Sequence, residues 1–225
     1  MKKSIVFLFL MSLFTSLSFA QHRQKFGINT GVTYSAFRNM DVPNVDYGYE
    51  TGILVGLSYE YYLSENLSIK TNLSYDKKSS KGSTHTVVQE FPDPAFTEAD
   101  INFKFHYNYL TLPVLLKYEF KNTHGFFING GPFFGYLLDS EFEGSASDGI
   151  TSQNYTESTT DYNNKFDFGI TSGIGKVFQL KNKSSIVVEF RNNLGLFQTN
   201  KNNTFNNNTV RSNSYNLLVG WSYDL

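Results

Sequence analysis

Hydrophobic and polar residues alternate one by one in eight stretches of the chain, which is the period of a β-strand. Within each stretch, one parity carries aliphatic and aromatic residues, and the other carries Gly, Ser, Thr, Asn and charged residues. The stretches are 26–37, 51–63, 67–76, 105–120, 126–138, 166–178, 186–197 and 214–225. The pattern predicts eight strands, each with one apolar face and one polar face.

The connections between these stretches alternate between long and short. Short turns are expected at 64–66, 121–124 and 179–183, and long polar loops at 38–50, 77–104, 139–164 and 198–213. Outer-membrane barrels have short turns at one end and long loops at the other, whereas a sandwich has no reason to keep this order. We therefore expect an all-β, eight-stranded antiparallel up-and-down β-barrel. A hairpin within the second and third long loops would raise the number of strands to ten.

The N-terminus has the pattern of an export signal. Lys2 and Lys3 precede the apolar run 5–14, and small residues stand at Ser18 and Ala20. The run is too short for a spanning helix, which needs ~20 apolar residues. The pattern predicts a signal peptide over 1–20, cleaved before Gln21, and a mature domain over 21–225.

No later segment has the pattern of a transmembrane helix, and only helices and closed barrels satisfy every backbone group inside a membrane. The chain holds 22 Phe and 15 Tyr, residues that suit strands. The small polar residues at alternate positions fit the interior of a barrel whose apolar side faces lipid. We expect a transmembrane barrel in the outer membrane, surrounded by lipid. The alternative is a soluble periplasmic carrier, similar to a lipocalin, with its apolar face inside.

Charged residues at the polar positions of the strands indicate which face of each strand points into the barrel. They are Lys25, Glu60, Lys70, Lys117, Glu119, Glu189, Arg191 and Asp224. A Lys or Arg facing lipid at mid-membrane costs ~2–4 kcal/mol, so these side chains are expected inside the barrel. Four are basic and four acidic, which predicts a paired ionic network in the half of the lumen near the short turns. The alternative places some of them at the wet rim.

Lys176 falls on the apolar parity instead. It either reaches along the surface to the membrane interface or marks a β-bulge.

Composition excludes several kinds of chemistry. With 19 basic and 20 acidic residues, the chain has no excess of positive charge for nucleic acid. It has no cysteine, hence no disulfide, thiolate metal site or cysteine nucleophile. Ser83, His85 and Asp100 could form a Ser–His–Asp group, but their spacing matches no catalytic motif. An acidic loop lacks the spacing of a calcium site; its residues are Asp139, Glu141, Glu143 and Asp148. We expect neither an enzyme nor a cofactor.

Several motifs together resemble the PorT-like outer-membrane β-barrel family, small barrels abundant in some Gram-negative bacteria. The motifs are Tyr109 to Tyr118, Gly130 to Tyr136, Asp167-Phe168-Gly169, Glu189-Phe190-Arg191 and Leu194-Gly195-Leu196. The resemblance implies the barrel fold. It also implies a link to secretion-system assembly, which is the role of the family's namesake; most members have no assigned activity.

The last strand alternates Trp221, Tyr223 and Leu225. It is similar to the signal that the outer-membrane assembly machinery recognises, except that this signal usually ends on an aromatic residue.

The interior of an eight-stranded barrel is only wide enough for side chains, so a general porin is not expected. Our first hypothesis is a non-enzymatic barrel with a structural or surface-interaction role, whose long extracellular loops bind an unknown partner. The alternatives are a small-solute transporter or narrow channel, and the lipocalin-like carrier.

Overall fold

The computed structural model describes residues 23–40, 42–89, 96–120, 124–147, 152–201 and 209–225. These residues form nine strands and one short 3-10 helix, η1 (Thr160–Tyr162). The strands are β1 (Gln24–Arg38), β2 (Asp46–Tyr62), β3 (Leu67–Gln89), β4 (Phe96–Glu119), β5 (Phe126–Ser147), β6 (Ser152–Ser158), β7 (Phe166–Gln179), β8 (Ser184–Gly195) and β9 (Arg211–Asp224). No helix in the described ranges is long and apolar enough to cross a membrane.

Eight of the strands close into a ring. Each pairs antiparallel with the next, in the order β1-β2-β3-β4-β5-β7-β8-β9, and β9 pairs again with β1. β6 pairs with β5 and lies outside the ring. The predicted eight-stranded antiparallel up-and-down barrel is confirmed, and the expected signal peptide lies outside the described residues.

Two of the predicted long loops are in large part strand, so that prediction was wrong. β3 continues to Gln89 and pairs with β4 from Phe96 onward, while β5 continues to Ser147 and pairs with β6. The extra hairpin therefore lengthens the sheet beyond the ring and leaves the number of ring strands at eight. Alternation of apolar and polar residues fades there because neither face meets lipid, while the backbone ladder continues.

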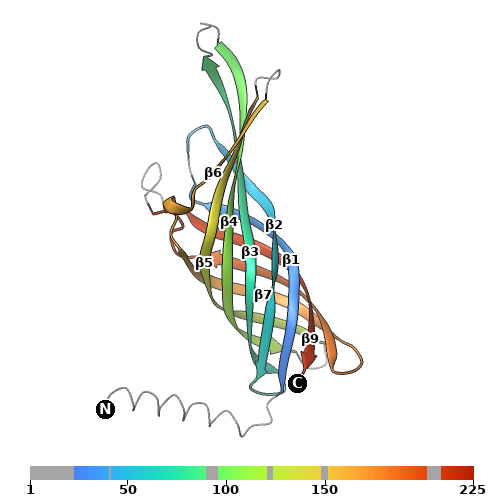
Figure 1. Cartoon of the computed structure of the whole chain (residues 1–225). Helices are drawn as coiled ribbons and strands as arrows, with labels where there is room; N and C mark the ends of the chain where they lie inside the picture. The colour runs from blue at the N-terminus through green and yellow to red at the C-terminus, as the bar shows by residue number, and fades with distance from the viewer. Residues whose placement is uncertain (1–22, 41, 90–95, 121–123, 148–151, 202–208) are drawn as a thin grey trace, which may run out of the picture.

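We call this projecting sheet the hairpin extension and define it as residues 46–49, 80–89, 96–105, 142–147 and 152–158. Figure 1 shows it rising from the end of the cylinder opposite the one at which β9 ends. Register shifts between Tyr49 and Leu54, and between Asn108 and Tyr109, lie where the ring gives way to the extension. Such irregularities bend a strand and increase its twist.

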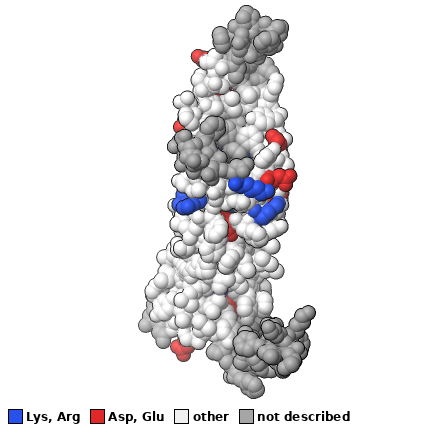
Figure 2. Space-filling model, turned by 90° about the vertical axis from the view of Figure 1, so that its left-hand side faces the viewer, with Lys and Arg blue, Asp and Glu red and all other residues white. Residues whose placement is uncertain are grey.

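The apolar parity faces outward in the ring. Leu57 and Trp221, for example, are 63% and 42% exposed, while Thr33, Asn72 and Thr171 on the polar parity are buried. Figure 2 shows a lower body largely free of charge beneath a level at which Lys, Arg, Asp and Glu gather. An outer apolar band is what lipid requires, and a lipocalin-like carrier would need the reverse.

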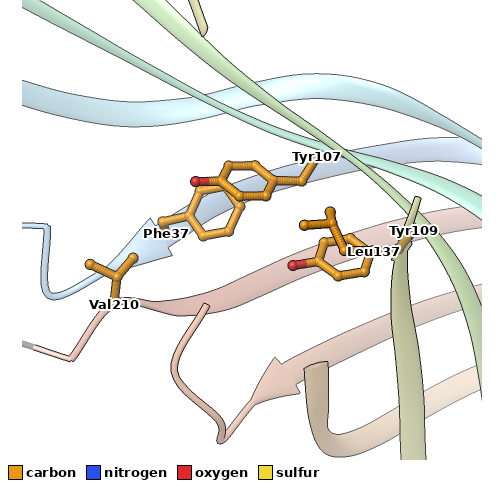
Figure 3. Packing of buried hydrophobic residues seen from close by; sticks show 5 residues of the cluster. All are labelled: Phe37, Tyr107, Tyr109, Leu137 and Val210. Carbon is orange, nitrogen blue, oxygen red and sulfur yellow. The ribbon is translucent and has the colours of Figure 1, made fainter. Parts of the chain in front are cut away.

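The alternation predicts a polar interior, but the interior of the barrel is not polar throughout. Near the hairpin extension, the side chains of Phe37, Tyr107, Tyr109, Leu137 and Val210 form an apolar cluster (Figure 3). The rings of Phe37 and Tyr107 are 4.4 Å apart, centroid to centroid. An eight-stranded ring has little internal space, and these large side chains fill it.

Candidate functional site

The centre of the barrel holds an ion pair between strands that are not neighbours in the ring. Lys70 on β3 places its Nζ 2.7 Å from Oε2 of Glu189 on β8. Oε1 of Glu189 accepts hydrogen bonds from Arg191 Nε at 2.8 Å and from Asn129 Nδ2 at 2.9 Å. The Lys70–Glu189 contact crosses the lumen and joins opposite walls of the barrel, whereas Arg191 lies on the same strand as Glu189.

A second group of charges lies closer to the short turns. Lys117 on β4 reaches across β3 to Glu60 on β2, with Nζ and Oε1 2.8 Å apart. Ser68 donates a hydrogen bond of 2.6 Å to the same carboxylate oxygen. Glu119 lies 3.8 Å from Lys117 and is partly exposed.

A third group lies at the rim where β1 begins and β9 ends. Lys25 Nζ is 3.5 Å from Asp224 Oδ1, and Arg23 forms a closer pair with Asp224 Oδ2 at 2.7 Å. Arg23 also falls on the polar parity, two residues before Lys25, but the sequence analysis did not extend the first strand that far. The eight predicted residues therefore lie in three ion-paired groups: six are at most 7% exposed, and Glu119 and Asp224 sit at the rim.

The sequence analysis missed a further pair, between Lys78 on β3 and Asp167 on β7. Their charged atoms are 2.9 Å apart and both side chains are fully buried. Lys78 Nζ also lies 4.9 Å from the ring centroid of Tyr109 and 4.8 Å from that of Phe133. The predicted third strand ended at residue 76. Extending its polar parity by two residues would have placed Lys78 inside.

Little open space remains between these groups. An interior cavity of about 30 Å³ is lined by, among others, Lys25, Glu60, Lys70, Glu189 and Arg191. A buried water needs roughly 10–15 Å³ of such space, so this cavity has room for only a few waters. With the apolar cluster above them, the ion pairs fill the ring with side chains.

Ser83, His85 and Asp100 lie on one face of the hairpin extension. His85 Nδ1 is 2.7 Å from Asp100 Oδ1, and this hydrogen bond to the carboxylate raises the pKa of His85 above its ordinary value. Ser83 pairs in the ladder with Asn102 and forms no hydrogen bond with His85 in the described structure. The contact between nucleophile and base that a Ser–His–Asp group requires is therefore not made.

The acidic residues at 139–148 do not gather around one point. Asp139 accepts a hydrogen bond from Asn108, and Glu143 lies 3.4 Å from His106 Nε2. Asp148 lies outside the described residues. Among the residues that are described, no three His, Asp or Glu side chains are placed to hold a metal ion.

Lys176 lies on the outer surface of β7. Its Nζ is 4.7 Å from the ring centroid of Phe126 and 5.1 Å from that of Phe178. The register of β7 with β8 runs through Lys176 without a shift, and the pair Phe126–Lys176 ends the ladder with β5, so no bulge is present at Lys176. A cation over aromatic rings near the end of an apolar surface fits the alternative of a side chain that reaches the membrane interface.

Comparison with known proteins identifies the family. Residues 19–201 match the family described as outer membrane protein beta-barrel domain. The chain belongs to this family. It is thus an outer-membrane β-barrel protein, whose surroundings include lipid. No relative was found among curated protein sequences.

Solved outer-membrane barrels are similar to the chain at low sequence identity. AlkL in lipid bilayers has 14% identity and a TM-score of 0.49, with 92% of each chain covered. Neisserial surface protein A has 12% identity and a TM-score of 0.42, covering 89% of this chain and 97% of its own. OprG from Pseudomonas aeruginosa has 11% identity and a TM-score of 0.41, covering 89% of this chain and 95% of its own.

Proposed function

We propose that this protein is a non-enzymatic outer-membrane barrel whose hairpin extension serves as a surface for interaction outside the cell. The observation that carries the proposal is the continuous sheet beyond the ring, in which β3 and β4 stay paired as far as Gln89 and Phe96. Because short turns lie at the periplasmic end of outer-membrane barrels, we assign the extension to the extracellular side. A paired sheet holds a binding surface more rigidly than an irregular loop does.

The filled lumen favours this function over a channel or transporter. A passing solute would have to displace the Lys70–Glu189 pair, the Lys78–Asp167 pair and the apolar cluster. Separating a buried ion pair costs several kcal/mol for each charge left alone. We therefore assign the predicted network of eight residues, together with Lys78 and Asp167, to closing and stabilising the barrel.

The proposal includes the route to the membrane. Residues 1–20 act as a signal peptide that is cleaved before Gln21, and residues 21–225 form the barrel domain. The outer-membrane assembly machinery inserts the barrel through its last strand, with Trp221 and Tyr223 as the aromatic part of the signal. The motifs of β4, β5, β7 and β8 favour the PorT-like branch of the family, in which a role in secretion-system assembly is a special case of the surface interaction.

The test shortens the extension and leaves the ring intact. Lys81 and Lys104 are ladder partners, so replacing residues 82–103 by Asn-Gly joins them through a two-residue hairpin turn. A control carries Lys181→Ala in a turn at the opposite end. Attachment of cells that display each variant is measured on immobilised matrix glycoproteins. The barrel is checked by its heat-dependent mobility on SDS gels and by conductance in planar bilayers.

We expect all three proteins to keep the mobility shift and to leave the bilayer silent, and only the shortened variant to lose attachment. Equal attachment by the shortened variant, or stepwise conductance of the parent protein, would overturn the proposal.

A further inference from the structure

The hairpin extension has two lateral edges, and they differ in how their backbone is protected. Its strands lie in the order β2-β3-β4-β5-β6, so β2 forms one edge and β6 the other. On the β2 edge, only Asp46 to Tyr49 pair with β3 before the register shifts, and Asp46 places a charge at the end of this short run. Short strands, charges and irregularities of this kind protect an edge against pairing with other chains.

The β6 edge lacks most of these features. The seven residues of β6 pair with β5 without a register shift, and they include no proline or lysine and a single charge, at Glu157. Among the strands that the structure describes, β5 is the only one that pairs with β6. Residues 153–158 are all exposed. An open edge of this kind is a template for pairing with another strand.

The hydrogen bonds of the β5–β6 ladder show which backbone groups of β6 are open. Thr159 N donates a hydrogen bond of 2.8 Å to Ser140 O, and these two residues continue the register of the ladder. In an antiparallel ladder, hydrogen-bonded pairs alternate with pairs that are not hydrogen bonded. The N–H and C=O groups of Asn154, Thr156 and Ser158 therefore point away from β5, toward the open side.

The one large side chain of β6 leaves this edge uncovered. The ring of Tyr155 lies over β5, since a Cβ atom at Gly144 would collide with it, and its centroid is 5.6 Å from that of Phe142. Tyr155 is nevertheless 48% exposed. A strand added at the edge would therefore meet open backbone groups and, on one face of the sheet, the side of an aromatic ring.

The spacing of donors and acceptors selects the chemistry of the occupant. The edge offers an N–H and a C=O at every second residue, and an extended polypeptide presents the matching groups at the same spacing. A glycan or an acyl chain has no such repeat. Aromatic, β-branched and opposite-charge pairs across a ladder stabilise a sheet. An aromatic or β-branched residue is therefore favoured opposite Tyr155, and a basic residue opposite Glu157.

We propose that the open edge of β6 binds an extended segment of another protein, which adds to the hairpin extension as a further strand. This segment carries an aromatic or β-branched residue opposite Tyr155 and a basic residue opposite Glu157. In strand addition of this kind, main-chain hydrogen bonds supply affinity and alternate side chains supply specificity. The inference rests on the proposed surface role and names the class of partner.

The probe is a peptide with capped ends, Thr-Lys-Thr-Tyr-Thr-Gln-Thr, which in an antiparallel pair places its Tyr opposite Tyr155 and its Lys opposite Glu157. It is titrated into the full mature chain in detergent micelles, while NMR follows the amide signals of residues 152–158. N-methylation of the third and fifth peptide residues blocks the groups that must face β6. N-methylation of the second and sixth residues is the matched control, because their backbone groups face away.

The protein is varied at the same edge. Thr156→Pro removes an N–H that points outward, and since this N–H makes no bond to β5, the extension keeps its own ladder. Thr156→Ala is the matched control, because it removes the same hydroxyl group and keeps the N–H. Heat-dependent mobility verifies the ring in each variant. The amide signals of residues 141–147, the ladder partners in β5, verify that β6 remains paired.

We expect saturable shifts with the parent protein and with Thr156→Ala. The affinity should be at least tenfold lower for Thr156→Pro, and for the peptide that is methylated at its third and fifth residues. The inference is overturned if no saturable binding occurs, or if these blocked forms bind as tightly as their controls. Shifts of the same amides that grow with protein concentration alone also overturn it, because a second copy of the chain then occupies the edge.

The same measurements separate this inference from the proposed function. If the peptide does not bind but shortening the hairpin still abolishes attachment, the inference fails and the proposed function stands. If the peptide binds but shortening leaves attachment intact, the proposed function fails instead.

Discussion

Four strands of the ring, β2 to β5, continue into the hairpin extension, yet the two regions distribute polar side chains in opposite ways. In the ring, Lys78 and Asp167 pair with both side chains fully buried. In the extension, the side chains of His85 and Asp100 pair while 59% and 73% exposed. In the extension, half-buried aromatic rings lie on the face opposite His85 and Asp100. In the ring, aromatic residues face outward as well as inward. Lipid outside the ring drives charge inward; water on both sides of the extension leaves charge at the surface.

The difference has an energetic consequence. A buried charge that loses its partner remains in a medium that solvates it poorly, and the cost is several kcal/mol. An exposed pair contributes about 0–1 kcal/mol because water replaces the partner. Equivalent substitutions in the two regions should therefore differ strongly in their effect on the free energy of unfolding.

The strongest contrast concerns removal of one carboxylate. Glu189→Ala leaves Lys70 and Arg191 without their shared acceptor, and we expect it to lower the free energy of unfolding by about 3–5 kcal/mol. Glu98→Ala in the extension should change it by no more than about 0.5 kcal/mol. Urea unfolding from lipid vesicles, followed by the fluorescence of Trp221, the single tryptophan, measures both. Equal transition midpoints would contradict the contrast.

The outer surfaces can be compared in the same way. Leu57 on β2 and Val87 on β3 are similarly exposed, at 63% and 56%, but only Leu57 lies in the apolar band of the ring. We expect Leu57→Arg to cost ~2–4 kcal/mol, because it places a charge against lipid. Val87→Arg should stay within about 0.5 kcal/mol. The same unfolding assay applies. A Leu57→Arg variant as stable as the parent protein would place that part of β2 outside the membrane.

The pair missed by the sequence analysis allows a double-mutant cycle. Asp167→Ala leaves the Lys78 ammonium group between two rings without its carboxylate, while Lys78→Met keeps the packing and removes the charge. We expect the double variant to be more stable than the sum of the two single effects predicts, with a coupling free energy of about 1–3 kcal/mol. A coupling near zero would mean that the buried pair contributes through packing alone.

The ring could be predicted from the sequence to a much greater extent than the hairpin extension could. Within the ring, lipid imposes strict alternation, so the strands and the inward side of Glu189 and Arg191 could be predicted from the pattern. In the extension, nothing imposes alternation, and the strand nature of 77–89 was missed. The alignment of Tyr47, Phe103 and Tyr155 on one face of the extension could not be found either, because these residues come together only through the register of five strands.

The smallest effect concerns the exposed pair of the extension. The hydrogen bond to Asp100, with further attraction from the carboxylates of Asp100 and Glu98, raises the pKa of His85 above 6.5. Because the folded value exceeds the unfolded one, any stabilisation is present below pH 6.5 and lost as the pH rises through the folded pKa. Asp100→Asn should return the pKa toward 6.5, and Glu98→Gln should lower it less, since Glu98 is 3.8 Å away. Titration of the His85 ring protons by NMR measures each value. A parent pKa below 6.5, or one unchanged by Asp100→Asn, would show that the two strands do not hold this pair together in solution.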